Sequence, residues 1–89
     1  METTEAQLKR MMMRSWRRGT KEMDLILGPY AEAHLGQMSP DELATYDRLL
    51  EENDTDLLPM ILGQQDAPAG LDDLIAKIAI FAKGRLTKA

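Results

Sequence analysis

Arg18, Gly19 and Glu22 form an R-G-x-x-E pattern at the end of a basic segment in an otherwise acidic protein. An arginine and a glutamate that flank a glycine are unusual on an ordinary helix surface, and they indicate a functional site. Local physics also allows a corner between two helices. Gly19 would then end one helix in the left-handed conformation, and Glu22 would be a favourable acid in the first turn of the next. An i,i+4 ion pair between Arg18 and Glu22 would add only ~0.3 kcal/mol.

The rest of the reactive inventory is small. The sequence has no cysteine, which excludes disulfides, thiolate zinc sites, iron–sulfur clusters and cysteine nucleophiles. His34 is the only histidine, and Ser15 and Ser39 are the only serines, so a Ser-His-Asp site is improbable. A metal would have to rest on carboxylates, and no loop spaces them as ligands. We therefore predict no catalytic residue, no metal site and no enzymatic activity of the chain's own.

Charge is unevenly distributed along the 89 residues, whose net charge is −4. Residues 9–21 hold six of the eleven basic residues, and residues 32–73 hold eleven of the fifteen acidic ones. This asymmetry predicts one basic face and one acidic face, although it is also typical of solvated helix surfaces. No aromatic series interleaves the basic residues, and no recognition helix is apparent, so we predict no nucleic-acid binding.

Helix punctuation is frequent, and no segment alternates with the period of a strand. Ser39 followed by Pro40 and Glu42 is the clearest signal, a capping box with proline in the first turn. The sequence predicts a compact all-α bundle of about five helices, a single domain over residues 1–89 that is ordered over about 4–84 with a flexible C-terminal tail. The expected helices run from residue 4 to Gly19, 20 to 36, 40 to about 53, 54 to 62 and 71 to 83.

Two details of these helices are expected to be irregular. Pro29 follows Gly28 inside the second helix, and proline lacks the N–H and clashes with the preceding turn. A break is therefore expected, with Pro29 at the first position of a new segment. Asp54 is expected to cap the short fourth helix, whose first turn Pro59 makes irregular.

Side-chain roles follow from helical spacing. Leu43, Tyr46, Leu49 and Leu50 are expected to face inward in the third helix. The short fourth helix is expected to contain Leu57, Leu58, Ile61 and Leu62. At least one of the consecutive methionines at 11–13 must be exposed or lie in an interface. Trp16, the only tryptophan, favours core anchoring over a role in partner binding.

The order of these features resembles the small succinate dehydrogenase assembly factors, the flavinylation factors that help load covalent FAD onto the flavoprotein subunit. The resemblance covers roughly residues 10 to 83. It rests on Trp16-Arg17-Arg18-Gly19 with Glu22-Met23-Asp24, then Pro29-Tyr30, Ser39 with Glu42, Leu49-Leu50-Glu51, Asp54, Asp56-Leu57 and a C-terminal helix flanked by basic residues.

The resemblance implies a protein that binds the flavoprotein subunit of succinate dehydrogenase, with the fumarate reductase flavoprotein as a further candidate client. It would promote attachment of FAD to a histidine of that subunit by positioning. Arg18, Gly19 and Glu22 would face the partner, with Asp24, Arg17 and Trp16 around them. Gly19 would allow close backbone approach, Arg18 would reach a carboxylate or carbonyl of the partner, and Glu22 would accept hydrogen bonds.

FAD would belong to the partner, since no glycine-rich strand–turn–helix binds a pyrophosphate here. The alternative is an antitoxin-like regulatory module that binds another protein, a label that some relatives of the family carry. No apolar run approaches the ~20 residues of a membrane span, and no signal peptide is apparent. Cleavage of a transit peptide would remove or crowd the R-G-x-x-E pattern, so we predict a cytoplasmic protein without membrane insertion.

Overall fold

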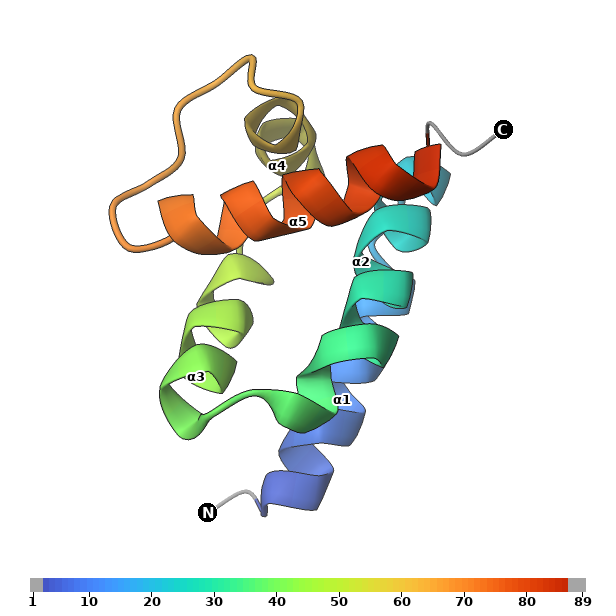
Figure 1. Cartoon of the computed structure of the whole chain (residues 1–89). Coiled ribbons are helices and arrows are strands. Elements are labelled where there is room, and N and C mark those ends of the chain that lie inside the picture. The colour runs from blue at the N-terminus through green and yellow to red at the C-terminus, as the bar shows by residue number, and fades with distance from the viewer. Residues whose placement is uncertain (1–2, 87–89) are drawn as a thin grey trace.

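Five α-helices account for most of the computed structural model, which describes residues 3–86. Their bounds are α1 Thr4–Trp16, α2 Lys21–His34, α3 Pro40–Leu49, α4 Asp54–Ile61 and α5 Asp72–Leu86, with a short 3₁₀ helix, η1, at Leu35–Gln37. No strand occurs between residues 3 and 86, which confirms the predicted all-α bundle of five helices. Helices α1 and α2 form an antiparallel pair, α5 crosses the start of α2 beside α4, and α3 stands opposite α2 (Figure 1).

Side-chain caps set three of the helix starts where the sequence places them. The hydroxyls of Thr3, Thr20 and Ser39 each accept a backbone N–H from the first turn of their helix. Ser39 and Glu42 form the predicted capping box, in which the Ser39 N–H donates to Glu42 Oε1 at 2.9 Å. That hydrogen bond holds the pKa of Glu42 below its usual value.

The expected break at Pro29 is wrong, because α2 continues unbroken through it to His34. Proline inside a helix forfeits one backbone hydrogen bond and costs ~3 kcal/mol. Here Leu27 before the proline and Tyr30 and Ala31 after it are all in the core, so packing on both sides keeps the two turns on one axis. The proline lies half-buried on the face of α2 beside Trp16.

Four other boundaries differ from expectation. Helix α1 ends at Trp16 rather than at Gly19. Asn53, not Asp54, is the N-cap of α4, and its side chain makes no cap hydrogen bond. Asp54 is the first helical residue, and its carboxylate is engaged elsewhere. Helix α3 ends at Leu49 rather than near Asn53, and α5 passes through Gly84 to Leu86. The last residues of the predicted flexible tail, 87–89, lie outside the described part of the chain.

The core is built around α2, which contributes buried residues on both sides of its axis. The predicted inward residues of α3 are confirmed, since Leu43, Tyr46, Leu49 and the following Leu50 are all buried. Met11 is fully buried whereas Met13 is 52% exposed, which confirms that the three methionines do not share one face. At the end of α4, Leu62 is 54% exposed, whereas Met60 is buried in the core.

One polar pair lies inside this core. The Ser15 hydroxyl donates to the Met11 carbonyl at 2.8 Å and is 2.6 Å from the Tyr46 hydroxyl. Both side chains are fully buried, and burial raises the pKa of Tyr46 to about 12. The phenol therefore stays protonated, and the pair ties α1 to α3 by a hydrogen bond that water does not reach.

Removing one member of this pair should cost more than removing both. Ser15→Ala leaves the Tyr46 hydroxyl buried without a partner, which should lower the free energy of unfolding by about 1–3 kcal/mol. Tyr46→Phe should cost less, because the Ser15 hydroxyl still donates to the Met11 carbonyl, and the double variant should lose less than the sum of the two. Urea denaturation of the three variants measures this, and strictly additive losses would show that the pair is not coupled.

Candidate functional site

The arginines of the N-terminal basic segment are paired with the acidic residues of the middle of the chain. Arg10 holds Asp47 through both terminal nitrogens, at 2.9 and 3.1 Å. Arg14 holds Glu51 at 3.0 Å and also donates to the Leu50 carbonyl at 3.0 Å. The hydrogen bond from Arg10 lowers the pKa of Asp47 below its usual value. The expected separate basic and acidic faces are thus wrong here, because these charges neutralise each other between α1 and α3.

Arg18 continues this series by another four residues, and it is the most enclosed of the three. Its Nε is 2.8 Å from Asp54 Oδ1, and its terminal nitrogens donate to the Leu50 and Glu52 carbonyls at 2.7 and 2.6 Å. The Arg18 side chain is 8% exposed and that of Asp54 is 12% exposed. The guanidinium therefore joins the corner between α1 and α2 to the turn between α3 and α4.

This arrangement changes the role of Arg18. The carboxylate and the carbonyls that it was expected to find on another protein are supplied by its own chain. The described residues include no ion pair between Arg18 and Glu22. Arg18 thus acts as an internal clamp, whose three donors reach three separate acceptors in a geometry that lysine would not reproduce.

The corner itself is held by the neighbours of Arg18. Gly19 has φ +102°, a backbone conformation that residues with a side chain rarely adopt. A β-carbon at this position would have no atom within 4 Å. The Arg18 N–H donates to Asp24 Oδ1 at 2.7 Å, and Thr20 caps α2. Glycine is needed for the turn, as the sequence predicted, and the space outside it is open. Asp24 is a structural residue that fastens α2 to the corner.

Glu22 is the one member of the R-G-x-x-E pattern that contributes to the fold only as an acid in the first turn of α2. Its side chain is exposed and makes no hydrogen bond or ion pair with any described residue. Arg17 and Lys21 are exposed on either side of it and are likewise unpaired within residues 3–84. The backbone of the corner is therefore held in place, while the charged side chains of Arg17, Lys21 and Glu22 are exposed to solvent. Arg17, Gly19 and Thr20 also line a shallow hollow of about 570 Å³ against the α3–α4 turn.

Trp16 borders this corner on the other side. It is 36% exposed, and its ring covers Gly28 so closely that a β-carbon there would overlap the ring. The outer part of the ring lines an open hollow of about 440 Å³ with Pro29 and Phe81. The predicted core anchoring is thus confirmed for one face of the ring only. The sequence predicted that Gly28 interrupts the helix. In the structure only glycine leaves room for the Trp16 ring at this position.

The sequence did not identify Asp54 as the partner of Arg18. Asp54 was interpreted as a helix cap, and 36 residues separate it from Arg18. The only available signal was the four-residue spacing of Arg10, Arg14 and Arg18 set against the acidic residues that follow position 46. His34 is packed between Tyr30, at a ring distance of 4.4 Å, and Phe81, at 5.6 Å, without an acidic partner among residues 3–84. Within the described part, no cluster of His, Asp or Glu could hold a metal ion.

Comparison with known proteins gives one consistent family. The model of a family described as the flavinator of succinate dehydrogenase matches residues 9–82. Proteins named succinate dehydrogenase assembly factor 2, mitochondrial, are similar to the chain. The one from Aspergillus terreus is 39% identical over 67 residues, which is 75% of this chain and 22% of that protein. The one from Schizosaccharomyces pombe is 37% identical over 67 residues, 75% of this chain and 48% of that protein.

A third relative, from Yarrowia lipolytica, is 43% identical over 56 residues, which is 63% of this chain and 39% of that protein. The chain thus spans between about a fifth and a half of the length of these relatives. All three carry the word mitochondrial in their names, so the prediction of a cytoplasmic protein is wrong. That prediction relied on missing leader signals, and such an absence does not identify a compartment. None of the described helices combines the length and apolarity that spanning a bilayer requires.

Substitutions of Arg18 and Glu22 should have different effects on stability, because Arg18 is enclosed by the fold and Glu22 is exposed. Arg18→Ala leaves the Asp54 carboxylate without its ion-pair partner and the Glu52 carbonyl without its donor, while the Leu50 carbonyl keeps Arg14. It should lower the free energy of unfolding by about 3 kcal/mol. Glu22→Ala removes an exposed first-turn acid and should change it by at most about 1 kcal/mol. Urea denaturation followed by circular dichroism checks both values. Equal losses in the two variants would contradict this assignment.

Proposed function

The chain belongs to the succinate dehydrogenase flavinator family, and we propose that it is an assembly factor that promotes covalent attachment of FAD to the flavoprotein subunit of succinate dehydrogenase. The proposal is supported by the family match over residues 9–82 and by the assembly-factor names of the relatives. The flavin and the histidine that it modifies belong to the partner in this proposal. The chain's own part is to bind that subunit and hold it in a productive geometry.

The observation that carries the proposed mechanism is the rigid corner at residues 17–24 with an unpaired glutamate on it. Arg18 and Asp24 hold the backbone from inside, so Glu22 projects from a fixed position. Preorganised contact residues lose little conformational freedom on binding, which favours affinity and a defined orientation of the partner. Arg18 supports binding indirectly, as a positioning residue.

Glu22 is proposed to accept hydrogen bonds from donors on the flavoprotein, and Arg17 and Lys21 to meet acceptors or acids beside them. Charged groups at an interface fix its register and select the right partner. Gly19 leaves open space at the tip of the corner, where a partner backbone can approach closely. Trp16 and the hollow beside it extend the same surface with an apolar patch.

The chemistry of the chain agrees with a helper that positions its partner. It has no cysteine. Its single histidine is packed against two aromatic rings. The proposed role needs no nucleophile or base from this chain, because the reacting groups lie on the partner.

Replacing the displayed carboxylate should slow flavin attachment without unfolding the protein. Glu22→Gln keeps size and helix position, and the rate of covalent flavin formation on the apo flavoprotein should fall about tenfold, since a charged interface contact is lost. Asp72→Asn is the matched control, because Asp72 is an exposed first-turn acid of α5 and lines neither the corner nor the hollow beside Trp16. The readout is flavin fluorescence of the flavoprotein band on denaturing gels. Unchanged rates with Glu22→Gln, or equal losses in both variants, would contradict the proposed contact.

A second experiment separates positioning from chemistry. The purified protein incubated with FAD alone should form no covalent adduct, and the apo flavoprotein should acquire flavin faster when the protein is added than without it. Mass spectrometry of both chains after denaturation locates the flavin. A covalent flavin on this chain, or the same rate with and without it, would refute the proposed role.

A further inference from the structure

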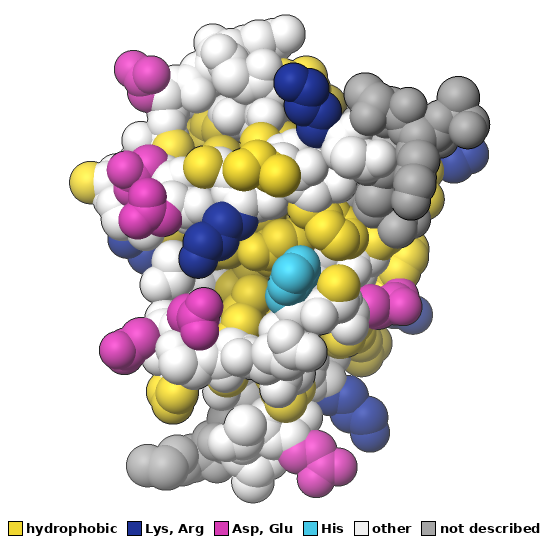
Figure 2. Space-filling model, in the orientation of Figure 1, with side chains coloured by type: hydrophobic (Ala, Val, Ile, Leu, Met, Phe, Trp, Pro, Cys, Tyr) yellow, Lys and Arg dark blue, Asp and Glu magenta, His cyan; other side chains and the backbone are white. Residues whose placement is uncertain are grey.

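A groove on a different part of the molecule separates α3 from α5, with α2 and η1 forming its floor. Two adjoining hollows of about 240 and 260 Å³ share Tyr30, Met38, Glu42 and Lys77 and together form this groove. Figure 2 shows hydrophobic side chains at the centre of this face and acidic side chains along its edge, over α3 and the first turn of α5. None of the corner residues 17–24 lines it.

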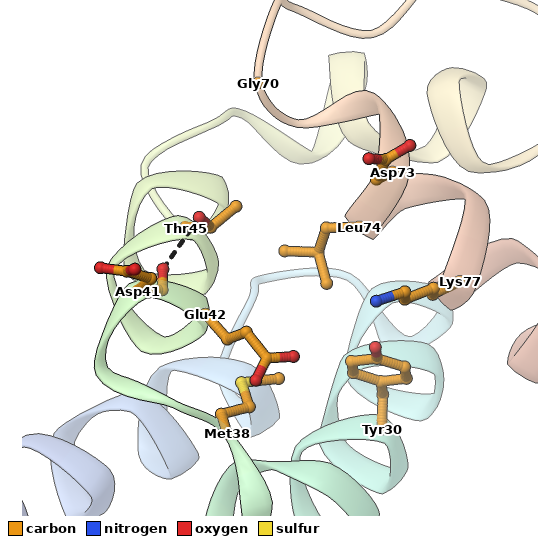
Figure 3. Close-up of a pocket in the computed structure, with 9 residues that line it drawn as sticks. All are labelled: Tyr30, Met38, Asp41, Glu42, Thr45, Gly70, Asp73, Leu74 and Lys77. Carbon is orange, nitrogen blue, oxygen red and sulfur yellow. Dashed lines mark hydrogen bonds between the residues drawn. The ribbon is translucent and has the colours of Figure 1, made fainter.

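Tyr30 supplies the observation that points to a ligand. The side chain is 4% exposed, yet its hydroxyl makes no hydrogen bond with any described residue and reaches the groove (Figure 3). Its ring is held by His34 and by an edge-on contact to Phe81 at 5.4 Å. No fully buried side-chain nitrogen or oxygen among the described residues lacks a partner, so the Tyr30 hydroxyl is open to the groove. A hydroxyl that is fixed in place and faces a groove without an internal partner is available to an external one.

Glu42 is the second fixed acceptor. Its Oε1 accepts the Ser39 N–H, which orients the carboxylate and leaves the other oxygen free. In Figure 3 the Glu42 side chain extends toward the centre of the groove, near the Tyr30 hydroxyl. Burial and the negative charge of Glu42 both raise the pKa of Tyr30. The hydroxyl is therefore protonated at neutral pH, and its oxygen is free to accept a hydrogen bond.

The charge of the lining favours a cation. Asp41, Glu42 and Asp73 contribute three negative charges against the single positive charge of Lys77. Lys77 is exposed and forms no ion pair with a described residue, although its charge contributes to lowering the pKa of Glu42. In Figure 3 its amine lies near the Tyr30 hydroxyl, so a bound cation would have to displace it toward solvent, whereas Glu42 is oriented by Ser39. Met38 and Leu74 provide an apolar surface on which an aliphatic stem can lie.

We propose that this groove binds an arginine side chain of a partner polypeptide, with the guanidinium between the Tyr30 hydroxyl and the Glu42 carboxylate and its stem on Met38 and Leu74. A planar guanidinium has five donors that can reach both acceptors at once, which an ammonium group does less well. The groove would thus be a second contact site, separate from the corner around Glu22. This inference stands whether or not the proposed function is correct.

The test uses N-acetyl-arginine amide as a probe, added to the intact isotope-labelled protein and followed by two-dimensional NMR. Saturable shifts should occur around Tyr30, Glu42 and Leu74 and not around residues 17–24. N-acetyl-citrulline amide, which has the same shape without the charge, should bind at least about tenfold more weakly. Equal binding of the two probes, no binding, or shifts confined to residues 17–24 would overturn the proposal.

Two variants sharpen the test. Tyr30→Phe keeps the ring contacts and removes only the unpaired hydroxyl, so the melting temperature should stay close to that of the parent while the probe binds about three- to tenfold more weakly. Lys77→Gln should strengthen binding about two- to fivefold, because it removes a repelling charge. Weaker binding of the arginine probe in Lys77→Gln would contradict the proposed repulsion and refute the proposal, as would unchanged binding in Tyr30→Phe.

Discussion

The clamp formed by Arg18 is the interaction on which the rest of the structure depends. A buried guanidinium is costly unless its donors are satisfied, and here a carboxylate and two backbone carbonyls satisfy it. The two carbonyls lie at the C-terminal end of α3 and in the turn beyond it, where helix carbonyls lack partners and a cation is favoured. The Arg18 side chain thus connects the end of α3, the start of α4 and the corner before α2.

The residues of the R-G-x-x-E pattern have two different roles: some stabilise the fold, and one is exposed to solvent. Arg18 and Gly19 are explained by the fold: one is the clamp and the other has a positive φ. The fold explains Glu22 only as a first-turn acid of α2, since its exposed carboxylate makes no hydrogen bond or ion pair with a described residue. An exposed residue on a rigid corner that contributes little to the fold is a better candidate for partner recognition than a residue whose contacts all lie within the fold. This distinction favours Glu22 over Arg18 as the contact residue.

Two surfaces of different character result from the same core packing. The corner displays mixed charges beside the half-exposed Trp16 ring, and the groove offers acceptors around the Tyr30 hydroxyl. Both rely on α2, whose core face fixes Tyr30 and whose first turn fixes Glu22. Its continuity through Pro29 is therefore important, because a break there would let the two surfaces move relative to each other.

The sequence by itself determined the helical class, the capped starts at Thr20 and Ser39, the turn at Gly19 and the family, because these depend on local propensities and on residue order. Only the tertiary structure decided that α2 is unbroken at Pro29, that Asp54 pairs with Arg18 and that Tyr30 opens into a groove. The first depends on burial that outweighs a local proline cost. The other two join residues far apart in the chain, and no local pattern encodes which distant partner a charge or a hydroxyl will meet.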